Sequence, residues 1–419
     1  MIESPLKILA RLPSPVRLLV TGSLVNKVGT FIVPYLTLVL LRDFHLAEGE
    51  VAALLAAYGI GSIVSILAGG ALTDRLGRRR TLMLSLFGSG VIAVSMGFAT
   101  SVGVFVPLLL GFGFVADLYR PAASAIVSDL LASSERATGF AALRLAVNLG
   151  FAVGMALGGF IADWNWRWLF FGDGLTTLLY GLVVLLFIPE TKPLSEPVRD
   201  SRTARAENPW RDPVFLQVAL VGFLFSMIFF SDMTVLPLTI TVSAGYPASV
   251  FGALVGLNGL LIAFFEMSAV GALRRFRRLR VAALGTLFLG AGFGITGLWL
   301  HWSWFLVAIL LGTLGEILAS PQQMAFVADW APPRARGQYL ALYQATWSLA
   351  LAVSPVVLLP LHSLLGEAAF WGVLGLVAVP AASLLLHLDR HADRPERLRG
   401  LSEPSSHDPT LLSAITPEG

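Results

Sequence analysis

An acid and a base, Asp117 and Arg120, lie in the middle of "LLLGFGFVADLYRPAASAIV", residues 108–127, which otherwise consists almost entirely of apolar and small residues. Further ionisable residues fall inside other long apolar runs: Lys27, Arg144, Asp232, Glu266 and Glu316. Such a residue costs about 2.5–3.5 kcal/mol in hydrocarbon, and usually faces a bundle interior or a wet cavity. Carboxylates placed there can take up and release protons.

We predict Asp117 and Glu316 as the principal proton-exchanging groups, with Asp232 and Glu266 as secondary ones, because no histidine falls in the middle of a predicted span. The predicted charge partners are Lys27, Arg120 and Arg144. Asp117 and Arg120 are three residues apart and so share a helix face. A carboxylate whose basic partner moves away changes its proton affinity, which is what proton coupling requires. The alternative is a set of static ion pairs.

Membrane-spanning helices must hold these residues. The 419-residue chain is 56% hydrophobic and 13% charged, and it has no cysteine, which excludes disulfides. Apolar runs of about 20 residues, enough to span a bilayer as a helix, recur along it. We predict twelve helices, at residues 16–41, 49–71, 81–100, 103–130, 137–162, 168–188, 213–240, 247–272, 281–300, 304–329, 337–361 and 367–388.

Lys and Arg indicate the orientation of these helices. Of the 29 such residues, 24 lie before helix 1, in alternate loops or in the tail. Cytoplasmic loops accumulate these residues, so we expect both termini to be cytoplasmic. Bases spread over alternate loops argue against nucleic acid as a partner.

The chain repeats itself at an offset of 200 residues, where Pro121 matches Pro321 and Asp129 matches Asp329. Glu316 lies one residue from the position related to Asp117, so we expect the two acids to face each other across a cavity. We predict an all-α fold of two pseudo-symmetric six-helix bundles with a common topology. Its parts are an N-terminal bundle (1–188), a cytoplasmic linker (189–212), a C-terminal bundle (213–389) and a cytoplasmic tail expected to be disordered (390–419).

The loop "GGALTDRLGRRR", residues 69–80, resembles the signature loop of the major facilitator superfamily, Gly-x-Leu-x-Asp-Arg-x-Gly-Arg-Arg. The twelve predicted helices and the repeat are also features of that family, so the resemblance covers essentially the whole chain. It implies the major facilitator fold and a secondary transporter that works by rocking of its two bundles.

The resemblance also implies a latch that closes the cytoplasmic side, with Asp74 against the start of helix 11 near residues 336–343. The predicted gate residues are Gly70, Asp74, Arg75, Gly77, Arg78, Asp129 and Arg136. The second half has "GALRRFRRLR" instead and lacks the acid, so we expect any latch to be asymmetric. The alternative is a basic anchor without a latch.

Helix 5 resembles the pattern of proton-driven antiporters in the superfamily, Gly-x8-Gly-x3-Gly-Pro-x2-Gly-Gly. The matching residues are Gly150, Gly154, Gly158 and Gly159. Ala141 and Met155 replace the first glycine and the proline. The match favours efflux, although small residues at this spacing also serve tight helix packing in any membrane bundle.

The predicted cargo contacts are polar or aromatic residues within the spans: Asn26, Tyr35, Tyr58, Asn148, Phe229, Tyr343 and Trp347. Aromatic side chains can supply an apolar binding wall. Packing or lipid contact is the alternative for each of them.

These observations predict a proton-coupled antiporter that exports hydrophobic small molecules, of the multidrug efflux type, in a bacterial inner membrane. The expected partners are a small-molecule substrate, protons and the lipid bilayer; we expect a monomer without cofactor or metal. One alternative is a proton symporter or facilitator importing a sugar, peptide or organic anion, which Lys27 and Met155 suggest. The other is a non-transporting receptor or scaffold. An enzyme is not expected, because no nucleophile with a base and no nucleotide-binding glycine loop is found.

Overall fold

The computed structural model describes residues 9, 11–132, 135–191, 209–332 and 335–391. These residues form twelve helical spans long and apolar enough to cross a membrane, as predicted. The spans of the first half are α2 (Ser14–Val28) with α3 (Ile32–Leu38) and a π-helical segment (Val39–Asp43), α4 (Glu48–Arg75), α5 (Arg78–Phe98), α6 (Val102–Ala116) with α7 (Tyr119–Leu130), α8 (Arg136–Trp164) and α9 (Arg167–Phe187).

The second half repeats this arrangement. Its spans are α10 (Pro213–Phe229) with α11 (Ser231–Thr234), α12 (Leu236–Leu238) and a π-helical segment (Thr239–Ser243), α13 (Ala248–Ala272), α14 (Arg278–Ile295), α15 (Trp302–Trp330), α16 (Arg336–Leu365) and α17 (Glu367–His391). The two π-helical segments are 200 residues apart, and so are the first residues of α5 and α14. The predicted class, two pseudo-symmetric six-helix bundles, is confirmed.

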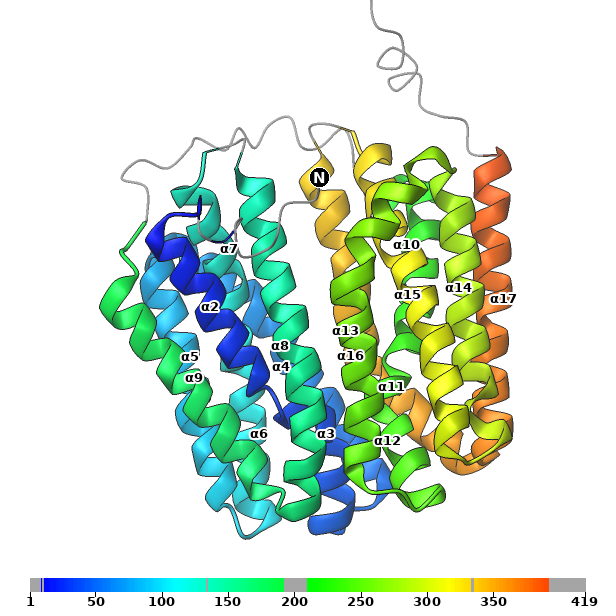
Figure 1. Cartoon of the computed structure of the whole chain (residues 1–419), viewed down its shortest axis with the longest axis horizontal. Helices are drawn as coiled ribbons and strands as arrows, with labels where there is room; N and C mark the ends of the chain where they lie inside the picture. The colour runs from blue at the N-terminus through cyan, green and yellow to red at the C-terminus, as the bar shows by residue number, and fades with distance from the viewer. Residues whose placement is uncertain (1–8, 10, 133–134, 192–208, 333–334, 392–419) are drawn as a thin grey trace, which may run out of the picture.

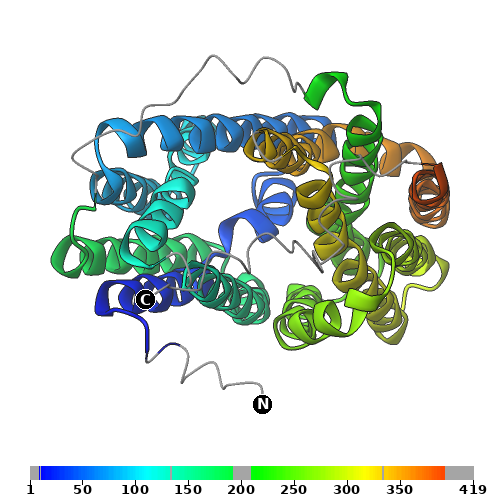
Figure 2. The same cartoon turned by 90° about the horizontal axis from the view of Figure 1, so that it is seen from above.

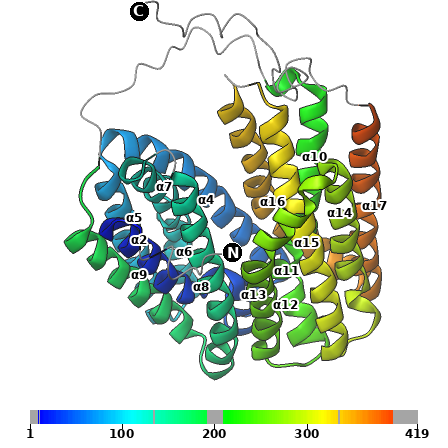
Figure 3. The ribbon, with the colours of Figure 1, turned by 45° about the horizontal axis from the view of Figure 1, so that its top comes forward.

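The part boundaries proposed at 188, 212 and 389 stay predictions. Residues 192–208 of the predicted linker and 392–419 of the predicted tail lie outside the described residues. We call the end of the molecule where α9 finishes and α10 begins the linker end, and the opposite one the far end. Figures 1 and 3 show the two groups of helices side by side, with α8 beside α13 and α4 beside α16. Seen from above, the helices ring a central region (Figure 2).

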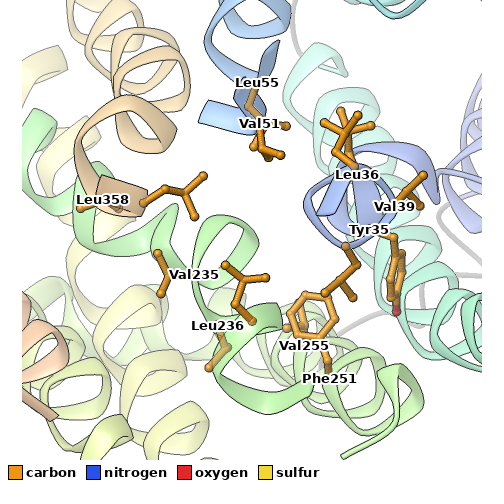
Figure 4. Close-up of a cluster of buried hydrophobic side chains, with 14 of the residues drawn as sticks. Tyr35, Leu36, Val39, Val51, Leu55, Val235, Leu236, Phe251, Val255 and Leu358 are labelled. Atoms are coloured by element: carbon orange, nitrogen blue, oxygen red, sulfur yellow. The ribbon is translucent and has the colours of Figure 1, made fainter. Parts of the chain in front are cut away.

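Apolar packing joins the two bundles at the far end. One continuous buried cluster there includes Leu36 from span 1, Leu55 from α4, Leu236 from α12, Val255 from α13 and Leu358 from α16, which Figure 4 shows converging from both halves. At the linker end, by contrast, each half has a core of its own, one around Leu82 and Ile126 and another around Phe215, Leu279 and Tyr339. The bundles therefore meet at the far end and are separate at the linker end.

Polar contacts reinforce the far-end contact. The Asp163 carboxylate of α8 accepts hydrogen bonds from the backbone N–H groups of Ala248 (2.6 Å) and Ser249 (2.9 Å), which begin α13 in the other half. Arg42 donates to the carbonyl of Thr241, also across the halves, at 2.7 Å. An acid at a helix N-terminus satisfies otherwise unpaired N–H groups, so Asp163 holds the two bundles together.

Glycines let the helices of opposite halves touch. A Cβ on Gly256 of α13 would lie 2.8 Å from the carbonyl oxygen of Ala152 in α8, and one on Gly59 of α4 would lie 2.7 Å from Cα of Ala352 in α16. Both neighbours are backbone atoms, which cannot move away without separating the helices. Close backbone approach through small residues is a common basis of helix association in membranes.

Three spans are interrupted within the bundle. Span 1 breaks at 29–31, span 7 near 230 and 235, and span 4 at Asp117 and Leu118. The predicted spans 16–41, 103–130 and 213–240 are therefore each one membrane span with a break inside it. At the span 1 break, the buried Asp173 carboxylate of α9 lies next to the backbone N–H groups of Phe31 and Ile32. Asp173 thus lies at the start of the second part of the broken helix.

We predict that Gly256→Ala destabilises the protein, because the added methyl group presses on the Ala152 carbonyl. Overpacking of this kind costs about 1–3 kcal/mol. The midpoint of thermal unfolding of the purified protein in detergent measures the effect. Gly372→Ala in α17 is the matched control, because a Cβ there meets nothing within 4 Å. Equal midpoints for the two variants would contradict this role of Gly256.

Candidate functional site

A cavity of about 160 Å³ lies between the halves, bordered by α8 of the first and α10, α13 and α15 of the second. Its polar lining comes from Arg144, Asn148, Asn258, Glu266, Glu316 and Ser320. Its apolar lining includes Phe151, Phe229, Ile262 and Ile317. Five of the predicted site residues line this one space: Arg144, Asn148, Phe229, Glu266 and Glu316.

An ion pair crosses this cavity from one half to the other. The Arg144 guanidinium, on α8, donates to the Glu266 carboxylate on α13. The Glu266 side chain is 10% exposed and that of Arg144 is 60% exposed. When the two bundles move relative to each other, the distance between Arg144 and Glu266 must change. The ion pair is therefore specific to this arrangement of the bundles.

Glu316 lies beside this bridge on α15. Asn258 of α13 donates through Nδ2 to the Glu316 carboxylate (3.3 Å) and to Thr313 Oγ1 (2.9 Å). The Glu316 carboxylate also interacts electrostatically with Glu266 and with Arg144. Glu316 therefore has a neutral partner in its own half and charged neighbours on both sides of the cavity.

Asp232 lies deeper in the second half, at the break of span 7, and is 5% exposed. Its carboxylate accepts a hydrogen bond from the N–H of Met233. Its Oδ1 atom has no hydrogen-bond partner in the described part of the chain. Asp232 and Glu316 both line a second cavity, of about 10 Å³.

Asp117 belongs to a separate cluster in the first half. It forms an ion pair with Arg120 at 2.6 Å, as the spacing predicted, and accepts a hydrogen bond from Ser62 of α4. The positive charge of Lys27 also interacts electrostatically with Asp117. The Lys27 Nζ atom lies 5.3 Å from the centre of the Tyr119 ring.

Asp117 lines neither of the two cavities that contain Glu316. The expectation that the two acids face each other across one cavity therefore stays a prediction.

Most of the predicted cargo contacts take part in packing instead. Asn26 donates to Thr177 (2.7 Å), Tyr35 to the carbonyl of Met155 (2.6 Å) and Tyr343 to Gln323 (2.9 Å). Tyr58 is buried and stacks on Phe112. Trp347 packs on Phe229 with ring centres 5.5 Å apart. Of the seven, only Asn148 and Phe229 line the described cavities.

The helix 5 glycines serve two contacts. A Cβ on Gly150, Gly154 or Gly158 would press on span 1 of the same half, and one on Gly159 would lie 2.6 Å from Cα of Ser249 in the other half. The pattern thus has a packing role in this structure.

The predicted gate residues lie at the linker end. Arg78 pairs with Asp129 (3.0 Å) and approaches Asp74 (3.7 Å), whose side chain is 70% exposed. Gly77 has φ +107°, which favours glycine, and the Glu190 carboxylate packs against it. A Cβ on Gly70 would meet nothing within 4 Å. Arg75 ends α4, and the side chain of Arg136 lies outside the described residues.

The second half keeps the corresponding ion pair, since Arg278 pairs with Asp329 at 2.8 Å. These residues are 200 positions from Arg78 and Asp129. The expected asymmetry therefore concerns Asp74 alone, whose counterpart is Arg274.

Sequence reasoning missed Asn258, Ser62 and Asp173. Each is a polar residue inside or near the end of an apolar span, and Asn258 is 200 residues from Tyr58. A polar residue in an apolar span is a signal that the sequence contains. It does not by itself indicate a site, because many polar side chains in helices form hydrogen bonds with the backbone of their own helix. Among the described residues, no three His, Cys, Asp or Glu side chains form a group that could hold a metal ion.

Comparison with known proteins gives a consistent picture. The sequence matches the Major Facilitator Superfamily over residues 19–326 and 239–415. It is 25% identical over 395 residues to the uncharacterized MFS-type transporter YhjO of Bacillus subtilis, covering 93% of this chain and 97% of the relative. It is 25% identical over 382 residues to a Na⁺, Li⁺, K⁺/H⁺ antiporter of Planococcus maritimus (83% and 88% covered).

Multidrug resistance protein 2 of Bacillus subtilis is 23% identical over 239 residues, which cover 56% of this chain and 60% of the relative. Among solved structures, a POT family transporter in complex with 5-aminolevulinic acid superposes with a TM-score of 0.77 at 15% identity, covering 91% of this chain and 99% of that one. At this identity the structural likeness concerns the fold alone.

We predict that Arg144 and Glu266 stabilise each other across the halves. Arg144→Glu should lower the thermal midpoint, because it places two acids together, and combining it with Glu266→Arg should restore the midpoint. The coupling free energy should be about 0.5–1 kcal/mol, because the Arg144 side chain is largely exposed. A double-mutant cycle on purified protein measures it. Additive effects of the two substitutions would contradict the bridge.

Proposed function

Because the chain belongs to the Major Facilitator Superfamily, a family of membrane transporters, we propose that it is a proton-coupled antiporter that exports hydrophobic small molecules. One observation carries the proposal: membrane-embedded carboxylates border the cavity between the halves, and Arg144 and Glu266 bridge that cavity. When the two bundles rock, the ion pair between Arg144 and Glu266 must change, and so must the charged groups near Glu316.

Proton exchange follows from such a rearrangement. A carboxylate binds a proton more readily when a cationic neighbour withdraws, and less readily when one approaches. The positive charge of Arg144, which belongs to the opposite half, acts on the Glu316 carboxylate. The proton affinity of Glu316 therefore depends on how the two halves are arranged. We assign Glu316 and Asp117 the principal roles, and Asp232 and Glu266 secondary ones.

Asp117 acts through contacts within the first half. Its partners Ser62 and Arg120 come from α4 and α7, so its proton affinity changes when these helices shift at the break of span 4. The Arg120 side chain is 57% exposed, which leaves it free to change partners.

The cavity wall supports a hydrophobic cargo. Phe151 from the first half and Phe229, Ile262 and Ile317 from the second form an apolar surface beside a few polar groups, the composition typical of small-molecule sites. We propose Asn148 and Phe229 as cargo contacts, with Trp347 supporting Phe229 from behind.

The names of two relatives support the antiport mode and the drug-export class. One relative is a Na⁺, Li⁺, K⁺/H⁺ antiporter and another is multidrug resistance protein 2. The rival assignment, import of an anionic cargo, drew on Lys27. That cation lies among acids, since its charge reaches both Asp117 and Asp173, which lessens its attraction for a free anion.

We further propose that the linker end is cytoplasmic in a bacterial inner membrane, as the distribution of Lys and Arg favours. The structure then corresponds to a conformation open toward the cytoplasm. In the opposite conformation, Gly70 and Asp74 would come into contact with the start of α16, and Arg78 with Asp129 would hold the loop that carries them.

The test is transport by purified protein in liposomes with an acidic lumen, using the hydrophobic dye Hoechst 33342 outside. An antiporter accumulates dye while protons leave the lumen, as an enclosed pH indicator reports. Dye accumulation only with the opposite gradient would establish symport instead. Absence of dye-dependent proton movement with either gradient would support the scaffold alternative.

Asp117→Asn and Glu316→Gln should each reduce gradient-driven dye accumulation by at least about a hundredfold, because loss of an acid–base group commonly costs 10²–10⁴-fold. Dye binding to purified protein should fall far less. Glu50→Gln is the matched control, because the exposed Glu50 carboxylate accepts a hydrogen bond from the N–H of Ala47 at the start of its own helix and lines neither described cavity. Unchanged coupling in both variants would remove the assignment of these acids.

A further inference from the structure

The smaller of the two cavities, at the break of span 7, has a chemistry of its own. It measures about 10 Å³, and Asp232, Asn258, Thr313 and Glu316 all contribute to its wall. A space of about 10–15 Å³ holds one particle of the size of a water molecule. Three elements of the second half, α11, α13 and α15, supply these residues.

The polar groups around this cavity are unbalanced in favour of acceptors. Asn258 uses Nδ2 to donate to Thr313 (2.9 Å) and Glu316 (3.3 Å), and Thr313 donates its hydroxyl hydrogen to the carbonyl of Ile309 (2.7 Å). The side-chain donors are therefore directed at acceptors within the cluster. Asp232 Oδ1 remains without a hydrogen-bond partner among the described residues.

The charges are unbalanced as well. The negative charge of Glu316 acts on Asp232, and both side chains line the same cavity. The charges of Glu266 on α13 and Arg144 on α8 act on Glu316, and Glu266 and Arg144 are already bound to each other. Uncompensated buried charge is costly, so such a site favours a bound cation.

We propose that a monovalent metal cation of the size of Na⁺ binds between Asp232 and Glu316. Hard cations take carboxylate, carbonyl and hydroxyl oxygens as ligands. Asp232 Oδ1, the Glu316 carboxylate and Thr313 Oγ1 form such a set. Ca²⁺ takes about six to eight oxygens, which three side chains in a cavity for one particle do not supply.

The inference rests on the proposed function in one respect, because both carboxylates are among the acids assigned to proton exchange. The metal cation and protons therefore compete for the same oxygens. Sodium would bind best at alkaline pH, where both acids are ionised, and acidification would release it.

The test is binding of radioactive sodium to the full-length purified protein in detergent at alkaline pH, with choline chloride holding the ionic strength constant. We expect saturable binding that is lost on acidification. Asp232→Asn should abolish it, and Thr313→Val should weaken it by about tenfold or more, as the loss of one metal-site partner does. Each variant's thermal midpoint in sodium-free buffer establishes that it is folded.

Thr286→Val is the matched control for Thr313→Val. Thr286 is a buried threonine on the neighbouring α14 that donates to the carbonyl of Ala282 at 2.8 Å, and it lines neither cavity. Its substitution should leave sodium binding unchanged. Absence of saturable binding in the wild type, or binding by Asp232→Asn as tight as in the wild type, would overturn the site.

Dye transport in sodium-free liposomes separates this inference from the proposed function. Proton-coupled transport without any sodium binding would contradict the proposed sodium site but not the proposed antiporter function. Saturable sodium binding that depends on Asp232, without proton-coupled transport, would support the site and overturn the antiporter.

Discussion

The cost of placing charge in hydrocarbon is the constraint on which this structure depends. Each embedded ionisable group needs a partner or a wet surface, and the fold provides partners both between the halves and within the first half. Arg144 reaches Glu266 across the cavity, and Asp117 pairs with Arg120 beside a helix break. The same groups that would be costly in lipid are thereby placed where motion of the halves can change their surroundings.

The two halves are joined more extensively at one end than at the other. A shared apolar core, the Asp163 cap on α13 and the glycine contacts join the halves at the far end, whereas separate cores stabilise each half at the linker end. Each bundle can then move as a unit, since its own core is undisturbed. The breaks of spans 1, 4 and 7 lie near Lys27, Asp117 and Asp232, so interruptions of the helices and ionisable groups coincide.

Much of the architecture could be predicted from local pattern. Hydropathy predicted twelve spans, and the offset of 200 residues predicted the repeat that the paired π-helical segments display. Asp117 and Arg120, three residues apart in the sequence, pair across the break between α6 and α7. The resemblance of residues 69–80 to the signature loop predicted the family, and the positive φ of Gly77 explains one of its glycines.

The site was harder to predict because it depends on how helices are rotated about their axes. Tyr35, Tyr58 and Tyr343 have the right type and depth for cargo contacts, yet each is turned into packing. Asp173 lies near a helix end, and its position at the start of the second part of span 1 depends on the break in that distant span. The position of Asn258 beside Glu316 likewise results from the packing of α13 against α15.

The central claim is that the acids between the halves control which end of the protein is closed. Because the chain has no cysteine, spin labels can be attached at introduced cysteines, and electron spin resonance can measure their separation. The exposed pair Ala132 and Ala272 reports the linker end, and Ser101 with Ser363 reports the far end. Acidification should change the two separations in opposite directions, and Glu316→Gln should produce the acidic distances at every pH. Separations that ignore pH, or that change in the same direction at both ends, would contradict the account.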